Sequence, residues 1–164
     1  MEWMLLPLKR YAEFSGRSRR QEYWMFILFT VLGGFVFSLF DKVLGLEIGD
    51  EGSASRTGVL STLFSLATIV PSIAVGVRRL HDTDRSGWWL LSPIPGGIAG
   101  AVAGGVIGMA VGSGLGGTMI GGIVGAVVAS IALFVFNVSE GDRGANRFGA
   151  DPKNPEGDLV DVFR

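Results

Sequence analysis

The sequence predicts an all-α membrane protein: a polytopic bundle of four transmembrane helices. Apolar residues make up 48% of its 164 residues and charged residues only 18%, against about 25% charged in soluble domains. The charges gather in four clusters separated by long uncharged stretches, and residues 86–139 contain no charge and no histidine. Because one bilayer crossing takes about 20 apolar residues, these stretches are long enough to cross.

The first transmembrane helix is expected at residues 22–44. A basic segment precedes it, and Tyr23 and Trp24 at its start are typical of side chains that lie at headgroup level. The apolar run is longer than a signal-peptide core and no cleavage site follows it, so the helix is expected to remain in the protein. Residues 3–8 favour a short interfacial helix, which Pro7 limits.

The second helix is expected at residues 59–77, with a kink at Pro71. A glycine-rich polar loop, residues 41–58, precedes it. A dense polar segment follows and ends at the double tryptophan Trp88–Trp89, which is typical of an interfacial anchor.

The charge-free residues 86–139 would extend about 80 Å as one continuous helix. That length accommodates two crossings and a turn, so helices are expected at 89–111 and 118–138. The glycine-rich residues 112–117 favour the turn, and the two prolines of residues 92–95 favour a short separate piece at the start.

Glycines recur at every fourth position in these two helices, and residues four apart lie on one helix face. Such a glycine ladder favours close backbone packing, which holds helices together in lipid. Two interpretations stay open: a hairpin packed within one protomer, or an interface in a homo-oligomer or pore. The glycines expected to pack are Gly100, Gly104, Gly108, Gly112, Gly117, Gly121 and Gly125.

Charge predicts the topology of a single membrane domain, residues 1–139, followed by a polar tail, residues 140–164. With four helices and both termini in the cytoplasm, twelve of the fourteen lysines and arginines lie inside. Three helices would place only eight there, so the positive-inside rule favours four. The tail is expected to be cytoplasmic and loosely ordered.

Three polar motifs occur in order: FSGRSRRQEYW at residues 14–24, RRLHDT at 78–83 followed by the double tryptophan, and GANRFGADP at 144–152. Together they resemble a family of small bacterial inner-membrane proteins, the YhaH-like proteins of domain-of-unknown-function family eight hundred and five. The resemblance implies a bacterial inner (plasma) membrane location and no established activity. The chain differs from the family pattern in an added glycine-rich stretch before the third motif and in Ala150, where proline is common.

Four helices would bring the three motifs to one face of the membrane. Arginine forks with a nearby carboxylate suit an anionic lipid headgroup; the alternative is that they orient the protein and join helix ends. The candidate headgroup-binding or ligand-binding residues are Arg17, Arg20, Glu22, Arg78, Arg79, His81, Asp82, Asn146 and Arg147.

Several function classes lack support. No nucleotide-binding or hydrolase motif is present, the net charge of −1 gives no attraction to nucleic acid, and one histidine with two carboxylates is a weak metal site. No catalytic residue, metal or cofactor is therefore assigned. The leading hypothesis is a non-enzymatic protein that binds anionic membrane lipid or passes a small solute. The alternatives are a membrane-interface enzyme using His81 and Asp82, and a scaffold or assembly subunit for a protein partner.

Overall fold

The computed structural model describes residues 2–49 and 56–154. In this part of the chain the elements follow in the order α1 (Glu2–Lys9), α2 (Arg20–Leu44), β1 (Glu47–Ile48), β2 (Thr57–Gly58), α3 (Val59–His81), the 3-10 helix η1 (Gly87–Leu91), α4 (Pro93–Ala110) and α5 (Leu115–Val138). Helices α2, α3, α4 and α5 are each long and apolar enough to span a membrane. The prediction of a helical protein with four candidate spans is therefore confirmed.

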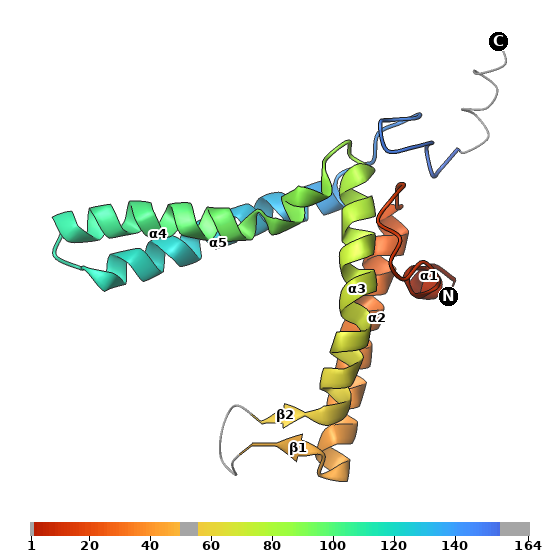
Figure 1. Ribbon diagram of the computed structural model, residues 1–164, viewed down its shortest axis with the longest axis horizontal. Coiled ribbons are helices and arrows are strands. Elements are labelled where there is room, and N and C mark those ends of the chain that lie inside the picture. Colours follow the sequence, from red (N-terminus) through yellow and green to blue (C-terminus); the bar gives the residue numbers. More distant parts are fainter. Residues whose placement is uncertain (1, 50–55, 155–164) are drawn as a thin grey trace.

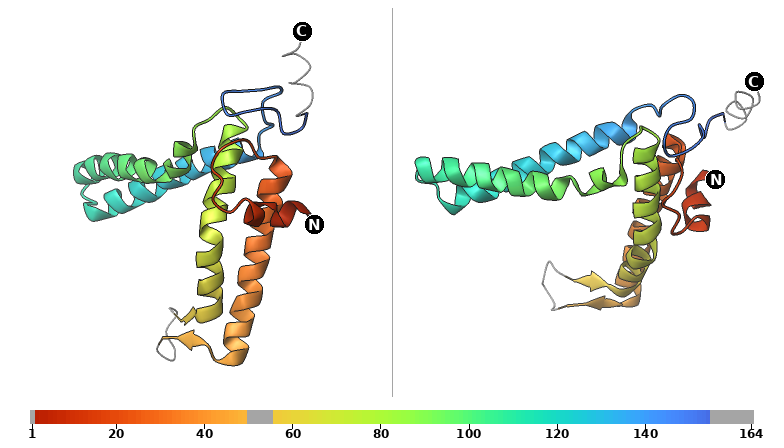
Figure 2. Two further views of the ribbon diagram at one scale, coloured as in Figure 1. Left: turned by 45° about the vertical axis from the view of Figure 1, so that its right-hand side comes forward. Right: turned by 45° about the horizontal axis from the view of Figure 1, so that its top comes forward.

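The four long helices form two hairpins (Figure 1). Helices α2 and α3 run side by side and are joined by the short antiparallel pair β1–β2. Helices α4 and α5 form the second hairpin, which starts at one end of α3 and projects sideways, away from the first hairpin (Figure 2). Within the described residues the hairpins meet near that end, where the segment that follows α5 also lies, and α1 packs beside α2 and α3.

At the opposite end of the first hairpin, Asp41 of α2 caps α3. Its Oδ1 accepts a hydrogen bond from the N–H of Leu60 at 2.8 Å, and its Oδ2 accepts one from the N–H of Ser61 at 2.9 Å. These N–H groups belong to the first turn of α3 and have no partner within the helix. Gly58 allows the approach, since a Cβ atom there would lie 2.7 Å from Ser61 Oγ and closer still to the carboxylate.

Three helix boundaries differ from the sequence predictions by three residues or more. Helix α3 continues through Pro71 to His81 instead of ending at residue 77. The reason is that Glu22 of α2 pairs with Arg78, and Asp82, the residue after α3, pairs with Arg79. Helix α4 begins at Pro93 rather than at residue 89, since residues 87–91 form η1 and proline suits the first position of a helix. Helix α5 begins at Leu115, three residues before the predicted start.

Helices α4 and α5 approach each other through glycine. A Cβ atom built on Gly108 would lie 3.0 Å from the carbonyl oxygen of Gly114, and one on Gly117 would lie 2.7 Å from the Cα of Gly108. Gly104 and Gly121 are equally close, since a Cβ on either would lie 2.8 Å from the Cα of the other. Gly100 and Gly125 continue the contact.

Gly112 does not take part in this contact, contrary to the sequence prediction. It follows the end of α4 with a φ of +75°, a conformation that glycine adopts without strain, and a Cβ there would meet nothing within 4 Å. Its role is to turn the chain between the two helices.

Candidate functional site

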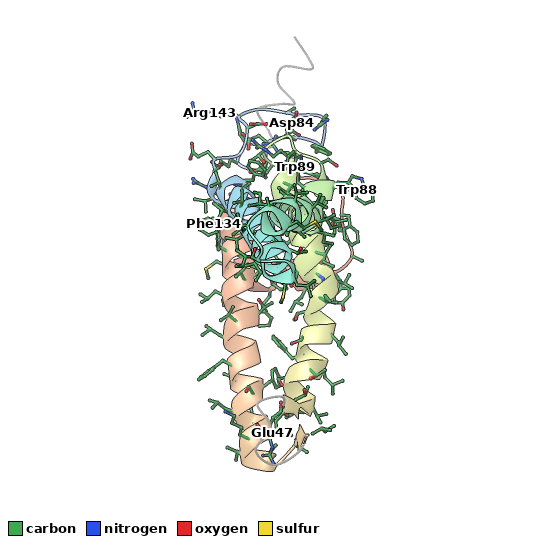
Figure 3. The ribbon with its side chains drawn as sticks, turned by 90° about the vertical axis from the view of Figure 1, so that its left-hand side faces the viewer. Glu47, Asp84, Trp88, Trp89, Phe134 and Arg143 are labelled. Carbon is green, nitrogen blue, oxygen red and sulfur yellow. The ribbon has the colours of Figure 1, made fainter. Side chains whose placement is uncertain are left out.

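The charged motifs meet at the end of the molecule where the two hairpins join. Asp84 and Arg143 lie at this end and Glu47 at the opposite one (Figure 3). At its centre is the Asp82 cluster, formed by Arg17, Arg79 and Asp82, whose side chains are almost completely buried. Asp82 Oδ1 accepts from Arg17 Nε at 3.0 Å, and Oδ2 accepts from Arg79 Nη1 at 2.5 Å. A single carboxylate thus joins the segment before α2 to the end of α3.

Arg79 also caps α5. Its Nε donates to the carbonyl oxygen of Asn137 at 3.1 Å, and its Nη2 donates to that of Ser139. The last carbonyl groups of a helix lack internal partners and carry partial negative charge, so a guanidinium there stabilises the helix end. Because Arg79 belongs to α3, this cap attaches the second hairpin to the first.

Arg17 holds the chain that follows α5. Its Nη2 donates to the carbonyl oxygen of Asp142 at 2.5 Å, and its Nη1 donates to that of Gly144 at 2.6 Å. The backbone of Asp82 reinforces the contact, because its carbonyl oxygen accepts from the N–H of Asp142 at 2.8 Å. Residues 140–154 are therefore tied to the helix ends, whereas the sequence predicted a loosely ordered tail; residues 155–164 lie outside the described part.

Asp151 organises the same segment. Its carboxylate accepts from the backbone N–H of Lys153 at 2.8 Å and from that of Gly144 at 3.2 Å. Burial alone would raise the pKa of Asp151, but these hydrogen bonds and the nearby Arg17 hold the pKa below its ordinary value. The carboxylate therefore stays ionised and keeps the turn closed.

Glu22 and Arg78 form a second buried pair beside the Asp82 cluster. Arg78 Nη2 lies 3.1 Å from Glu22 Oε1, and the two side chains are 0% and 3% exposed. Arg10 and Glu13 form an ion pair with 2.7 Å contacts nearby, and the Arg10 guanidinium holds the pKa of Glu13 below its ordinary value. The buried pair joins the start of α2 to the end of α3.

The remaining predicted residues lie at the edge of the cluster. Arg20 pairs with Glu140 at 2.9 Å and Arg147 with Asp84 at 3.0 Å, and all four side chains are exposed. Asn146 reaches inward, because its Nδ2 donates to the carbonyl oxygen of His81 at 2.9 Å. All nine predicted residues thus lie at one end of the molecule, but most of their donors are directed at protein atoms.

The side chains of His81 and Asp82 are not hydrogen-bonded to each other but have separate partners. The Nδ1 of His81 lies 3.1 Å from the carbonyl oxygen of Gly16, and its ring stacks on Phe148 with centroids 3.8 Å apart. The carboxylate of Asp82 is meanwhile occupied by two arginines. Within residues 2–49 and 56–154 there is no group of three histidines or carboxylates that could hold a metal ion.

A cationic pocket of about 290 Å³ opens beside the Asp82 cluster, at the start of α2. Its lining residues are Arg19, Arg20, Gln21, Asp82, Gly141 and Lys153. Arg19 donates through Nε to the carbonyl oxygen of Pro152 at 2.7 Å and lies over the ring of Trp3, so both ends of the chain shape the pocket. Three cations thus surround a cavity in which the one lining carboxylate is already paired.

The cationic pocket is lined in part by residues outside the nine site residues predicted from the sequence, among them Arg19, Gly141 and Lys153. Arg19 lies in the first motif, but only the fold distinguishes it from its neighbours by turning it towards the tail. A Cβ on Gly141 would lie 2.8 Å from Asp82 Oδ1 and closer to Oδ2, so glycine is needed there. Its position two residues after Ser139, the residue that follows α5, was the available signal. The sequence did not indicate Lys153, because nothing in the composition of a polar tail predicts where the tail folds back onto the helices.

Comparison with known proteins agrees with the motif pattern. The sequence is 40% identical over 154 residues to inner membrane protein YhaH of Escherichia coli strain K12, covering 93% of this chain and 98% of that protein. It is 39% identical over 153 residues to inner membrane protein YhaI of the same strain, covering 93% and 97%. No solved structure matches significantly. The family described as a protein of unknown function, DUF805, matches residues 11–150. The chain therefore belongs to the DUF805 family.

Proposed function

We propose that this membrane protein is non-enzymatic and binds the phosphate of an anionic lipid headgroup in the cationic pocket. The observation that carries this proposal is the grouping of Arg19, Arg20 and Lys153 around one cavity at a helix end. The relatives are named inner membrane proteins, and a helix end is where a span meets the headgroup layer. Each Lys or Arg near an anionic membrane surface contributes about 1 kcal/mol to attraction.

Donors in the pocket support an anion as its ligand. Arg19 uses Nε and Nη2 on Pro152, and its Nη1 makes no hydrogen bond to the described residues. Lys153 Nζ makes no hydrogen bond to the described residues and lies 3.9 Å from the exposed carboxylate of Glu140. No side chain caps the first turn of α2, whose N–H groups lie at the same place and favour an anion.

Lys153→Gln should weaken binding of phosphatidylglycerol about fivefold, the ratio that corresponds to one lost cation at a membrane surface. The double variant with Arg19→Gln should weaken it further. Binding can be measured by native mass spectrometry of the detergent-solubilised protein, titrated with phosphatidylglycerol and with phosphatidylcholine of the same acyl chains.

Arg147→Gln is the matched control. It removes the same charge from the same end, but Arg147 pairs with Asp84 outside the pocket and is 60% exposed. Equal weakening by Arg147→Gln and Lys153→Gln would mean general surface attraction and would contradict a specific pocket. Competition by inorganic phosphate at equal concentration would identify free phosphate, rather than lipid, as the ligand.

The proposal includes a topology in which both termini and the cationic pocket lie in the cytoplasm. This topology places twelve of the fourteen lysines and arginines on the cytoplasmic side, as the positive-inside rule favours. The chain has no cysteine, so single cysteines can report the sides. Ile48→Cys, at a side chain that is 71% exposed, should react with an impermeant maleimide added outside cells.

Ser113→Cys, at the tip of the second hairpin, should react in the same way if α4 and α5 cross the membrane. Protection of Ser113→Cys would mean that the hairpin lies within the membrane, and a periplasmic reporter signal after residue 164 would overturn the topology.

We propose further that the glycine ladder acts as a zipper that holds α4 to α5 within one protomer. The close approaches of Gly104 to Gly121 and of Gly108 to Gly117 support this role. These glycines also line a groove of about 400 Å³ on the hairpin. Their backbone contacts close the space between α4 and α5, so the geometry does not favour passage of a solute between these two helices. The separation of His81 from the Asp82 carboxylate likewise gives no support to the enzyme hypothesis. If the protein is instead a scaffold, a partner protein should co-purify with it and should still do so with the Lys153→Gln variant.

A further inference from the structure

A second pocket, of about 460 Å³, lies on the face of α3 that packs against η1. One wall is a stripe of α3 residues four positions apart, Ile73, Val77 and His81. The other wall comes from η1, and the exposed side chain of Trp88 stands beside the end of α3 (Figure 3). Its volume lies within the range of small-molecule sites, about 300–1,000 Å³.

This cavity, called the His81 pocket below, has a mostly apolar lining without charge. Its nine residues include no lysine, arginine, aspartate or glutamate. The nearby cations are engaged elsewhere: the guanidinium of Arg85 lies 4.0 Å from the ring centroid of Phe136, and Arg147 pairs with Asp84 at 3.0 Å. Burying an anion without a countercharge is costly, so these walls favour a neutral ligand. The ligand therefore differs in chemistry from that of the cationic pocket.

His81 provides a polar group for that ligand. A carbonyl oxygen only accepts hydrogen bonds, so the contact with Gly16 requires the proton on Nδ1 and leaves Nε2 as an acceptor. Stacking on Phe148 and the hydrogen bond from Asn146 to the backbone hold the residue in place. Within the described residues Nε2 has no partner, so a ligand hydroxyl can donate to it.

We propose that the His81 pocket binds a neutral glycerolipid, a monoacylglycerol or diacylglycerol type of molecule. The glycerol hydroxyl donates to Nε2 of His81, and the acyl chain lies along Val77 and Ile73. A membrane lipid is the occupant because α3 is a candidate span and the stripe runs along it from a polar end into its apolar part. The site does not depend on the cationic pocket.

The probe for this site is a monoacylglycerol with a photoreactive diazirine in its acyl chain, applied to the full-length protein in phosphatidylcholine nanodiscs. Mass spectrometry should locate the labels within residues 73–91. His81→Asn keeps an amide donor near the Nδ1 position but removes Nε2, and should reduce this labelling about fivefold, the ratio for one neutral hydrogen bond. His81→Gln keeps a polar atom near Nε2 and should retain more labelling, although both variants lose the ring.

Two further measurements keep the test decisive if a variant folds poorly. A probe whose hydroxyls are methylated cannot donate, and should label the unaltered protein about as weakly as the hydroxyl probe labels His81→Asn. Ile73→Trp should fill the pocket and abolish labelling of residues 73–91. Equal labelling by the two probes, or labels spread evenly over lipid-facing residues such as Val124, would overturn the proposal.

Discussion

Asp82→Ala should lower the free energy of unfolding by about 3–5 kcal/mol, because it removes the carboxylate that pairs with the buried guanidinium groups of Arg17 and Arg79. Arg17 is 5% exposed and Arg79 is 0% exposed, so solvent screens their charges poorly once the carboxylate is lost. The same change frees the tail segment and the end of α5 that these arginines hold. Unfolding of the purified protein by titration with a denaturing detergent measures the effect.

Glu140→Ala provides the control for this prediction. It also removes a carboxylate from an arginine at the same end of the molecule, but Arg20 and Glu140 are 41% and 63% exposed. An exposed ion pair contributes between zero and about 1 kcal/mol. Similar losses from the Asp82→Ala and Glu140→Ala variants would show that the Asp82 cluster does not join the segments.

Gly104→Leu should separate α4 from α5 and destabilise the hairpin by at least about 1–3 kcal/mol, the usual cost of overpacking. A Cβ at this position would lie 2.8 Å from the Cα of Gly121, so backbone rather than a flexible side chain would have to move. Val106→Leu adds apolar volume to the same helix at a side chain that is 66% exposed, and should change little. Thermal unfolding in detergent should therefore distinguish the two variants.

A pair of cysteines shows whether this packing occurs within a protomer. A Cβ on Gly97 would lie 3.5 Å from the Cβ of Ala126, within the range of about 3.5–4.5 Å found in disulfides. The double variant Gly97→Cys with Ala126→Cys should form a disulfide inside a single chain. A covalent dimer on a non-reducing gel would place the glycine contact between protomers, and equal stability of Gly104→Leu and Val106→Leu would contradict any such contact.

Local properties of the chain were sufficient to locate the four candidate spans. Apolar length identified α2, α3, α4 and α5, and the proline-containing residues 92–95 indicated the break before α4. The error at the end of α3 has a physical reason: charged residues usually end a membrane helix, but here Glu22 and Asp82 neutralise Arg78 and Arg79 and the helix continues. A hydropathy profile cannot show these ion pairs, because the residues that pair with the arginines are found only in the folded protein.

The sequence by itself determined which stretches are apolar enough for lipid, where the charges are concentrated and how the three motifs follow one another. These are properties of neighbouring residues, and they persist whatever the rest of the chain does. The tertiary structure decided which charges neutralise each other. It paired Asp82 with Arg17, 65 positions earlier, and placed Lys153 beside Arg19. It also decided the direction of the α4–α5 hairpin, because an element that is apolar on every side carries no preference of its own for a neighbour.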